Sequence, residues 1–275
     1  MSFRNKICSH LSDYRLAMLG IKEDGKFLYR GNYLNKAHIL DTTHSNLNLI
    51  TNYRDQFLIL DKKNPIKRHR YFHHLNSSQA LCLNLFYPLI AENKLAIFLK
   101  YLGIGLEGEL TTIFEKESEI ENTNRKTSFD FYVNNGQVAE LFVEVKYTED
   151  GFGKAKHDVE HIDKFHETYL PLLAKSSYLL PVCCEMEFFL NHYQILRNLI
   201  HISNDSTVIF LCPLGNTKVI KEAEYAREYC LNDAGKNNFR LIYLEDLVTF
   251  LEKQYEHQAL GSFYKSFRQK YLPIF

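Results

Sequence analysis

Hydrophobic and polar positions along the chain follow a strand period in some segments and a helix period in others. Alternating or continuous apolar runs predict strands at 110–117, 127–133, 138–147, 207–212 and 239–243. Apolar residues at helical spacing predict helices at 80–86, 92–102, 156–173, 187–202, 220–230 and 245–255. The polar stretch 134–137 between the second and third strands is typical of an antiparallel hairpin. Strands and helices in this order predict an α/β (α+β) fold, a mixed sheet flanked by helices.

The first part of the chain carries a weaker pattern. Residues 1–75 have short apolar clusters between polar and basic stretches, so we treat them as an N-terminal extension to a main domain at 76–275. The polar run 76–78 offers N-cap chemistry for the first helix of that domain, and Pro88 is expected to kink or end this helix. Cations, histidines and aromatic residues mix at 62–74, which suits either nucleic-acid contacts or a solvated loop.

Composition limits the function only loosely. Lys+Arg and Asp+Glu are each 33, so the formal net charge is zero and any nucleic-acid surface must be local. The six cysteines form no C-x-x-C pair and lie mostly in apolar runs, which predicts reduced thiols in the core. No apolar run approaches the roughly 18 residues of a membrane span, and the first residues lack the apolar run of a signal peptide. We therefore expect a cytoplasmic protein without a membrane segment.

The third predicted strand carries two charges on an apolar background. Its period of two places Glu144 and Lys146 on one face, and Val143 and Val145 on the other, which we expect to face the core. Buried charges need partners, and a divalent cation held by Glu144 and by Asp130 of the preceding strand would be one. Carboxylate oxygens suit Mg²⁺ or Mn²⁺. Lys146 would then orient a water or stabilise charge developing on a phosphate, which predicts phosphodiester hydrolysis.

An Asp in one strand, a short hairpin and Glu-x-Lys in the next strand resemble the PD-(D/E)XK nuclease superfamily, which has the restriction-endonuclease-like fold. Further segments are similar to a bacterial group of restriction endonucleases in that superfamily, at 77–86, 127–131, 144–153 and 193–198, so the resemblance covers roughly residues 70–250. The resemblance implies that Asp130 and Glu144 are metal ligands, that Lys146 is the catalytic lysine, and that Gln194 is a helix residue at the rim of the site. It also implies metal-dependent cleavage of double-stranded DNA, in restriction or defence.

The chain departs from that pattern where an acidic residue of the first helix commonly lies near the metal. Gln79 and Asn84 are the polar residues that this helix offers instead. Glu115 or Glu117 on the first strand would have to supply a third acidic ligand, and the sequence does not choose between them. Phe129 also stands before the aspartate, where the pattern has proline.

The connection between the two site-bearing strands provides a geometric requirement. The Asn-Gly pair at 135–136 favours a tight two-residue turn, which would place Asp130 opposite Leu141 and away from the face of Glu144. The site hypothesis therefore predicts a wider turn or a bulge, with Asp130 opposite Phe142 or Glu144. The alternative is an exposed hairpin on which the charges form a cross-strand ion pair.

A second motif points to different chemistry. His157-x-x-Glu160-His161 spells the inverted zincin pattern, with both histidines expected on one helical face. Taken literally, it indicates a zinc metalloprotease. The many charges around the motif are instead typical of a solvated helix face.

A polar stripe follows one of the later predicted helices. Gln194, Arg197, Asn198 and His201 are spaced to share a helix face, which suits either DNA contact or the wet side of an amphipathic helix. With Gln79, we take Arg197 and Asn198 as candidate nucleic-acid residues. A DNA-binding or inactive nuclease-like module is the alternative to an active enzyme. Because cutting both strands of a duplex is simplest with two sites, a homodimer is a further expectation.

Overall fold

The computed structural model describes residues 1–105, 108–136 and 139–273, and the chain divides into two compact units. Unit 1 comprises Met1–Gly105 and Tyr243–Phe275, and unit 2 comprises Leu106–Ile242. These units do not follow the predicted boundary at residue 75. The interpretation of residues 1–75 as an extension to a nuclease domain stays a prediction.

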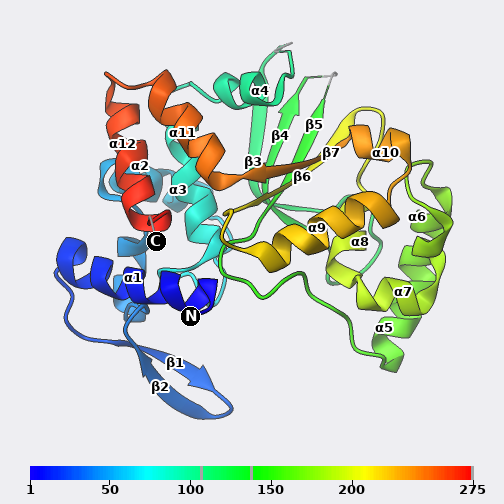
Figure 1. The fold of residues 1–275 in the computed structure, drawn as a ribbon, viewed down its shortest axis with the longest axis horizontal. Helices are drawn as coiled ribbons and strands as arrows, with labels where there is room; N and C mark the ends of the chain where they lie inside the picture. The colour runs from blue at the N-terminus through cyan, green and yellow to red at the C-terminus, as the bar shows by residue number, and fades with distance from the viewer. Residues whose placement is uncertain (106–107, 137–138, 274–275) are drawn as a thin grey trace. The chain divides into compact units, whose positions relative to one another are not determined.

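Unit 2 is built on a mixed sheet (Figure 1). Within the described residues the sheet has five strands in chain order: β3 (Leu110–Glu117), β4 (Ser128–Asn135), β5 (Glu140–Val145), β6 (Ser206–Cys212) and β7 (Phe239–Tyr243). β4 pairs antiparallel with β3 and with β5, whereas β5 pairs parallel with β6. The predicted mixed sheet flanked by helices is therefore confirmed, and the predicted strands lie within three residues of the observed ones.

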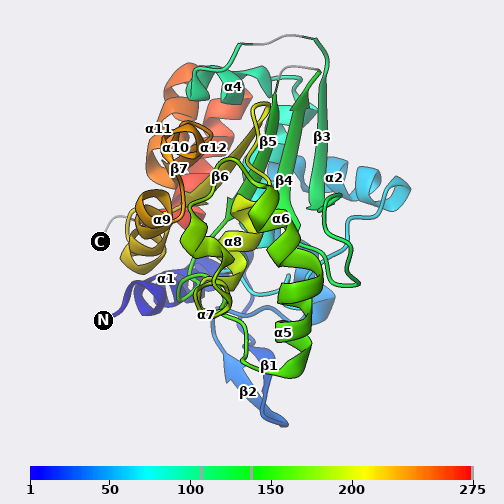
Figure 2. The ribbon, with the colours of Figure 1, turned by 90° about the vertical axis from the view of Figure 1, so that its right-hand side faces the viewer.

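Two of the helices predicted in unit 2, at 156–173 and 187–202, are each interrupted. The observed helices of this unit are α5 (Val159–Lys164), α6 (Leu170–Lys175), α7 (Met186–Asn191), α8 (Tyr193–Leu199), α9 (Thr217–Tyr229) and α10 (Asp233–Asn237), and Figure 2 shows α5 to α8 beside the sheet. A π-helical turn at Phe165–Tyr169 separates α5 from α6, where the Leu170 N–H bonds to the Phe165 carbonyl. Pro171 follows at the start of α6 and has no N–H to continue a regular ladder. Similarly, His192 leaves the helical conformation between α7 and α8.

Both faces of β5 are buried, which corrects the expectation that only its valine face meets the core. Phe142, on the same face as Glu144, is 7 % exposed. Phe142 belongs to a cluster of buried side chains that includes Phe129 and Phe210 from the sheet, and Phe189 and Leu196 from α7 and α8. A strand that is covered on both faces places any charge it carries in the interior, where that charge needs a partner.

Unit 1 is mainly helical. Its elements are α1 (Phe3–Leu19), β1 (Gly25–Tyr29), β2 (Asn32–Lys36), a 3₁₀ helix (Thr42–Asn48), α2 (Thr51–Lys63), α3 (Ser78–Ala91), α4 (Ala96–Leu102), α11 (Leu244–Gln254) and α12 (Ala259–Tyr271). The β1–β2 hairpin projects from the helices of this unit (Figures 1 and 2). As predicted, Ser77 caps α3 by accepting from the Ala80 N–H. Pro88, however, lies inside α3 and does not end it.

Two further expectations concern cysteines and membrane spans. All six cysteines are free thiols, and Cys82, Cys183, Cys212 and Cys230 are buried. Among the described residues no single helix has the length and apolarity to cross a membrane. α3 and α4 have that length and apolarity only when they are counted as one segment, and the two helices meet at a bend of 114°.

Candidate active site

Asp130 and Glu144 lie on adjacent strands of unit 2, in the register that the site hypothesis requires. β4 and β5 pair Phe131 with Val143, and the Asn135 N–H donates to the Ala139 carbonyl at 2.8 Å. Continued by one residue, this register places Asp130 opposite Glu144. The tight turn is thereby excluded and the wider connection confirmed, although residues 137–138 of the turn lie outside the described part of the chain.

Asp130 is a buried carboxylate beside other carboxylates. Its Oδ2 accepts a hydrogen bond from the Val145 N–H at 2.7 Å, which fixes the side chain against β5. Asp130 is 8 % exposed and Glu144 is 5 % exposed. Burial raises the pKa of Asp130 well above its ordinary value, and the carboxylates of Glu144 and Glu115 raise it further. The site thus holds more negative charge than its surroundings compensate.

Lys146 provides the positive charge of the site and is held by two partners. Its Nζ lies 2.9 Å from Glu144 Oε1 and donates to Gln194 Oε1 at 3.1 Å. Burial lowers the pKa of Lys146, but Glu144 and Glu149 outweigh it, and the net shift is upward. Lys146 therefore remains protonated at neutral pH. We call Asp130, Glu144 and Lys146 the carboxylate–lysine cluster.

Gln194, near the start of α8, bridges the two charged residues that β5 presents. Its Nε2 donates to Glu144 Oε1 at 2.9 Å, while its Oε1 accepts from Lys146. The loop after β5 holds Gln194 in turn, because the Gly153 N–H donates to the same Oε1 at 2.9 Å and the Gln194 N–H donates to the Gly153 carbonyl at 3.0 Å. The structure therefore brings Gln194 into contact with the cluster.

Of the two candidates for a third acid, Glu115 is the one that acts on the site. The register of β3 and β4 places it opposite Asp130, and its Oε2 accepts from the Ser128 hydroxyl at 3.3 Å. Glu115 also has a φ of 56°, a left-handed conformation that costs a non-glycine residue about 1–3 kcal/mol and that clusters at functional sites. Glu117, by contrast, is exposed. Even so, the described residues contain no group of three or more His, Cys, Asp or Glu side chains arranged to hold a metal.

The donors that are present suit a hard divalent cation. Mg²⁺ is commonly bound through one or two carboxylates, with waters and substrate phosphate oxygens as its remaining ligands. Asp130 and Glu144 supply two carboxylates against the single charge of Lys146, and burial, followed by the Glu144 carboxylate, raises the pKa of Asp130. A cation placed between them would relieve this excess of negative charge, so this pair fits Mg²⁺ or Mn²⁺.

Two of the three residues proposed to contact nucleic acid are buried. Gln79 is buried in α3 of unit 1, where its amide donates to the Lys67 carbonyl and accepts from the His69 N–H. Asn198 is completely buried in α8. Neither side chain is accessible to a nucleic acid in this conformation. The basic stretch 62–74 is likewise partly engaged, since Arg68 pairs with Asp61 at 2.7 Å.

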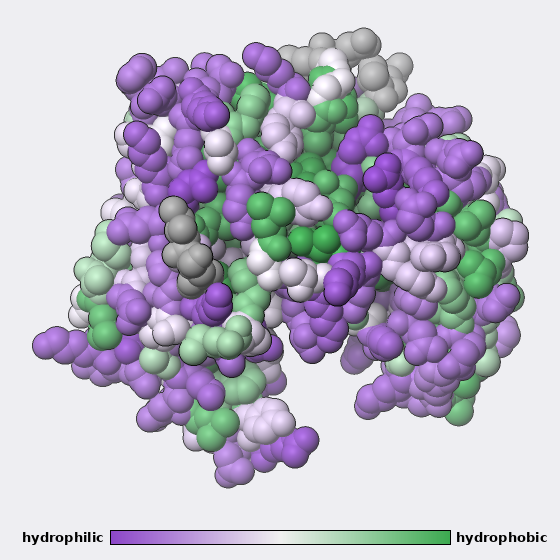
Figure 3. Space-filling model, viewed as in Figure 1, coloured by the Kyte–Doolittle hydropathy of each residue, from purple (hydrophilic) through white to green (hydrophobic). Residues whose placement is uncertain are grey.

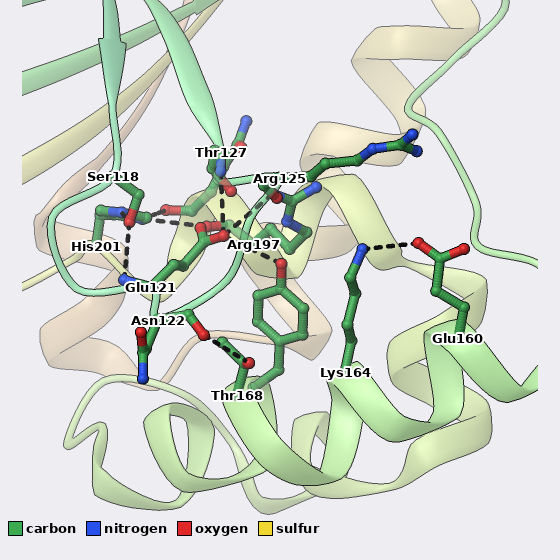
Figure 4. Close-up of polar contacts among 12 residues, drawn as sticks. Ser118, Glu121, Asn122, Arg125, Thr127, Glu160, Lys164, Thr168, Arg197 and His201 are labelled. Carbon is green, nitrogen blue, oxygen red and sulfur yellow. Dashed lines mark hydrogen bonds and ion pairs between the residues drawn. The ribbon is translucent and has the colours of Figure 1, made fainter.

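Arg197 belongs to a second buried polar group, which Figure 4 shows. Its Nη2 donates to Glu121 Oε2 at 3.1 Å, and the same oxygen accepts from the Thr127 N–H at 3.1 Å and the Tyr169 hydroxyl at 3.0 Å. We call Glu121, Thr127, Tyr169 and Arg197 the Glu121 cluster. It joins α8 to the segment between β3 and β4. His201, which follows α8, contacts the same segment, with its Nε2 2.8 Å from the Ser118 hydroxyl. The polar stripe of α8 is thus neither a wet helix face nor an open DNA surface.

The histidines of the zincin-like motif do not converge. His157 precedes α5, and its Nδ1 lies 3.3 Å from Glu187. His161 lies on α5 and its Nδ1 is 2.5 Å from Asp158. Because His157 is outside the helix, the two side chains do not share a helical face. The zinc-protease interpretation therefore loses its geometric basis.

A mixed sheet flanked by helices, with an Asp on one strand and Glu-x-Lys on its neighbour, defines a restriction-endonuclease-like protein. The family model described as "Restriction Endonuclease associating with ARP" matches residues 9–272, and the chain belongs to this family. The match extends over both units. Comparison with curated proteins and with solved structures found no match.

Proposed function

We propose that this protein is a metal-dependent endonuclease that hydrolyses phosphodiester bonds in DNA, with a role in restriction or defence. The observation that carries the proposal is the carboxylate–lysine cluster, in which two buried carboxylates lie on adjacent strands and Lys146 pairs with one of them, Glu144. Membership of a restriction endonuclease family supports it. Mg²⁺ or Mn²⁺ held by Asp130 and Glu144 would polarise the scissile phosphate and make an attacking water more acidic.

Lys146 is suited to stabilise charge. A lysine ammonium has three N–H donors, and Glu144 and Gln194 accept two of them. The third is then available to a phosphate oxygen as negative charge grows on it in the transition state. Because Lys146 stays protonated, it acts as a donor and a positive charge, and it does not remove a proton from the water. Gln194 is a positioning residue that holds the ammonium group and Glu144 in one arrangement.

A plasmid cleavage assay tests the proposal. Supercoiled plasmid would be incubated with wild type, with Lys146→Met, and with a matched control, Lys175→Met, which changes an exposed lysine of α6. We expect wild type and control to nick or linearise the plasmid with Mg²⁺ or Mn²⁺ and not with EDTA. Lys146→Met should be slower by about 10²–10³-fold, the usual effect of removing one donor that stabilises the transition state. Melting curves would confirm that this variant, which keeps the apolar stem of the lysine, is folded.

Two results would contradict the proposal. Equal cleavage by all three proteins would point to a contaminating nuclease. Binding of DNA by the wild type without metal-dependent cleavage would assign the chain to the non-catalytic alternative.

A further inference from the structure

A pocket of about 330 Å³ lies within unit 2, and its lining does not include Asp130, Glu144 or Lys146. Three segments line it: the loop after β5, the region where α7 meets α8, and α9. Lys218, Lys221, Glu222 and Tyr225 share one face of α9, because they are spaced at i, i+3, i+4 and i+7. In the space-filling view, hydrophilic residues dominate the visible surface of this unit, with apolar residues gathered in smaller areas (Figure 3).

One wall of the pocket is aromatic. The rings of His192 and Tyr225 stack with their centroids 5.3 Å apart and an interplanar angle of 11°. Tyr229 extends the stack, with its centroid 4.6 Å from that of Tyr225. Tyr225 and Tyr229 are 38 % and 58 % exposed. Phe188 packs against His192 in turn, with the ring centroids 4.3 Å apart, so a base would contact the parts of these rings that remain exposed. Partly exposed aromatic side chains are common contacts for the bases of unpaired nucleotides.

His192 adds a directional group to this wall. Its Nδ1 lies 2.9 Å from the Phe188 carbonyl oxygen, which can only accept a hydrogen bond. Nδ1 must therefore carry the proton, and Nε2 is the acceptor of the neutral imidazole. An exocyclic amino group of a base is a suitable donor to it.

The pocket lining also includes cationic residues. Lys154, Lys218 and Lys221 line the pocket together with a single acid, Glu222. The Glu222 carboxylate is already engaged, since its Oε2 accepts from the Phe152 N–H at 2.6 Å. Lys218 pairs with Asp150 at 2.9 Å, whereas in the described part of the chain Lys154 and Lys221 have no ion-pair partner. These two lysines are therefore available to a phosphate group.

The pocket and the cluster share a piece of backbone. The Phe152 N–H is bound by Glu222 in the pocket wall, and the next N–H, that of Gly153, is bound by Gln194 in the site. The Phe152 ring lines the pocket and also lies 5.2 Å from Lys146 Nζ. A nucleotide in the pocket would consequently be a close neighbour of a phosphate at Lys146.

We propose that this pocket binds one unpaired nucleotide of the DNA strand next to the scissile phosphate, with its base against His192 and Tyr225 and its phosphate against Lys154 and Lys221. The inference deepens the proposed function and rests on it for the identity of the substrate. The pocket volume is at the lower end of the range for ligand sites, about 300–1,000 Å³, so it suits a single nucleotide. A base enters such a pocket only from a single strand or after flipping out of a duplex.

Binding in EDTA tests the pocket without any cleavage. Fluorescence anisotropy would measure the affinity of the full chain for a short, end-labelled single-stranded DNA. Tyr225→Leu should weaken binding about tenfold, since base–aromatic contacts contribute about 1–3 kcal/mol per base. Lys221→Gln should lower the slope of log K against log salt by about 0.7, the value for one phosphate contact on a single strand. The exposed residues Tyr33 and Lys175 provide matched controls, as Tyr33→Leu and Lys175→Gln.

The outcomes separate the pocket from the proposed function. Absence of single-strand binding by the wild type overturns the pocket, and so does an unchanged affinity of Tyr225→Leu. An unchanged salt slope for Lys221→Gln, or an equal loss in the controls, also overturns it. If binding depends on Tyr225 and Lys221 but the plasmid stays uncut, the pocket stands and the endonuclease function fails. If the plasmid is cut with metal but binding is independent of both residues, the endonuclease function stands and the pocket fails.

Discussion

The two buried charged groups of unit 2 differ in how their charges are compensated. In the Glu121 cluster, one carboxylate oxygen receives a guanidinium, a hydroxyl and a backbone N–H. In the carboxylate–lysine cluster, the single ammonium group pairs with Glu144, and burial together with Glu144 raises the pKa of Asp130. The first group is neutral within itself. The second carries an excess of acid.

This difference separates structural from functional burial of charge. A balanced ion pair that ties a helix to a distant loop specifies the fold, and removing one partner is costly. An excess of like charge destabilises the isolated protein, so that its presence points to a ligand that completes it. Net charge after counting close partners therefore indicates a structural role for Glu121 and supports the proposed metal-binding role of Asp130.

The largest effect is expected from breaking the balanced group. Arg197→Met would leave the fully buried Glu121 carboxylate without its counter-charge, which should lower the free energy of unfolding by about 3–5 kcal/mol. Urea unfolding measures this loss. Below its melting temperature the variant should still cleave DNA at the wild-type rate. The matched control Arg227→Met, at an exposed position on α9, should stay within about 0.5 kcal/mol of wild type. If Arg197→Met lowered the free energy of unfolding by less than about 1 kcal/mol, the Glu121 cluster would not have the structural role that distinguishes it from the carboxylate–lysine cluster.

Removing the bridge of the acid-rich group should affect activity more than stability. Gln194→Leu deletes the contacts to both Glu144 and Lys146, and loss of a group that orients metal ligands typically costs about 10–100-fold. Initial rates of plasmid nicking measure it. Gln194→Glu should be slower still, because it adds another carboxylate beside Glu144. A full cleavage rate in Gln194→Leu would contradict the positioning role proposed for Gln194.

A third buried charge, in unit 1, extends the comparison to a cation without an acid. Lys270 is completely buried, and its Nζ donates to Asn48 Oδ1 at 2.7 Å. Burial lowers the pKa of Lys270 well below its ordinary value, with Arg54 adding to the shift. The unfolded chain therefore binds more protons below the ordinary lysine pKa, and the free energy of unfolding should rise with pH between the folded and ordinary pKa values, by up to about 1.4 kcal/mol per unit.

Denaturant unfolding between about pH 7 and pH 9 checks this smaller effect. The free energy of unfolding should rise less steeply with pH in Lys270→Gln than in wild type. Lys265→Gln, at an exposed position on α12, should keep the wild-type slope. Parallel slopes in all three proteins would mean that Lys270 keeps its proton in the fold.

Local patterns in the sequence predicted the sheet well. The alternation of residues 110–117 coincides with β3, and the chemistry demanded of Asp130 and Glu144 correctly required a wide connection after β4. Strand period and residue type are local properties, so a single sequence carries them.

Other features depend on contacts between distant segments and could not be predicted in this way. Glu121 lies in a stretch without periodicity, and only the fold brings Arg197 to it. Unit 1 joins the first 105 residues to the last 33, which no local pattern indicates. α12 and the break at His192 were also missed. The prediction that Gln194 lies at the site came from the family resemblance, because its position in the sequence does not connect it to β5.

We propose that the acid-rich group binds a divalent cation and that the balanced group does not. Isothermal titration of Mn²⁺ into metal-free protein tests it most directly. We predict one saturable equivalent in wild type and in Glu121→Gln, and none in Asp130→Asn. Wild type without saturable binding, or Asp130→Asn binding as wild type does, would contradict the account.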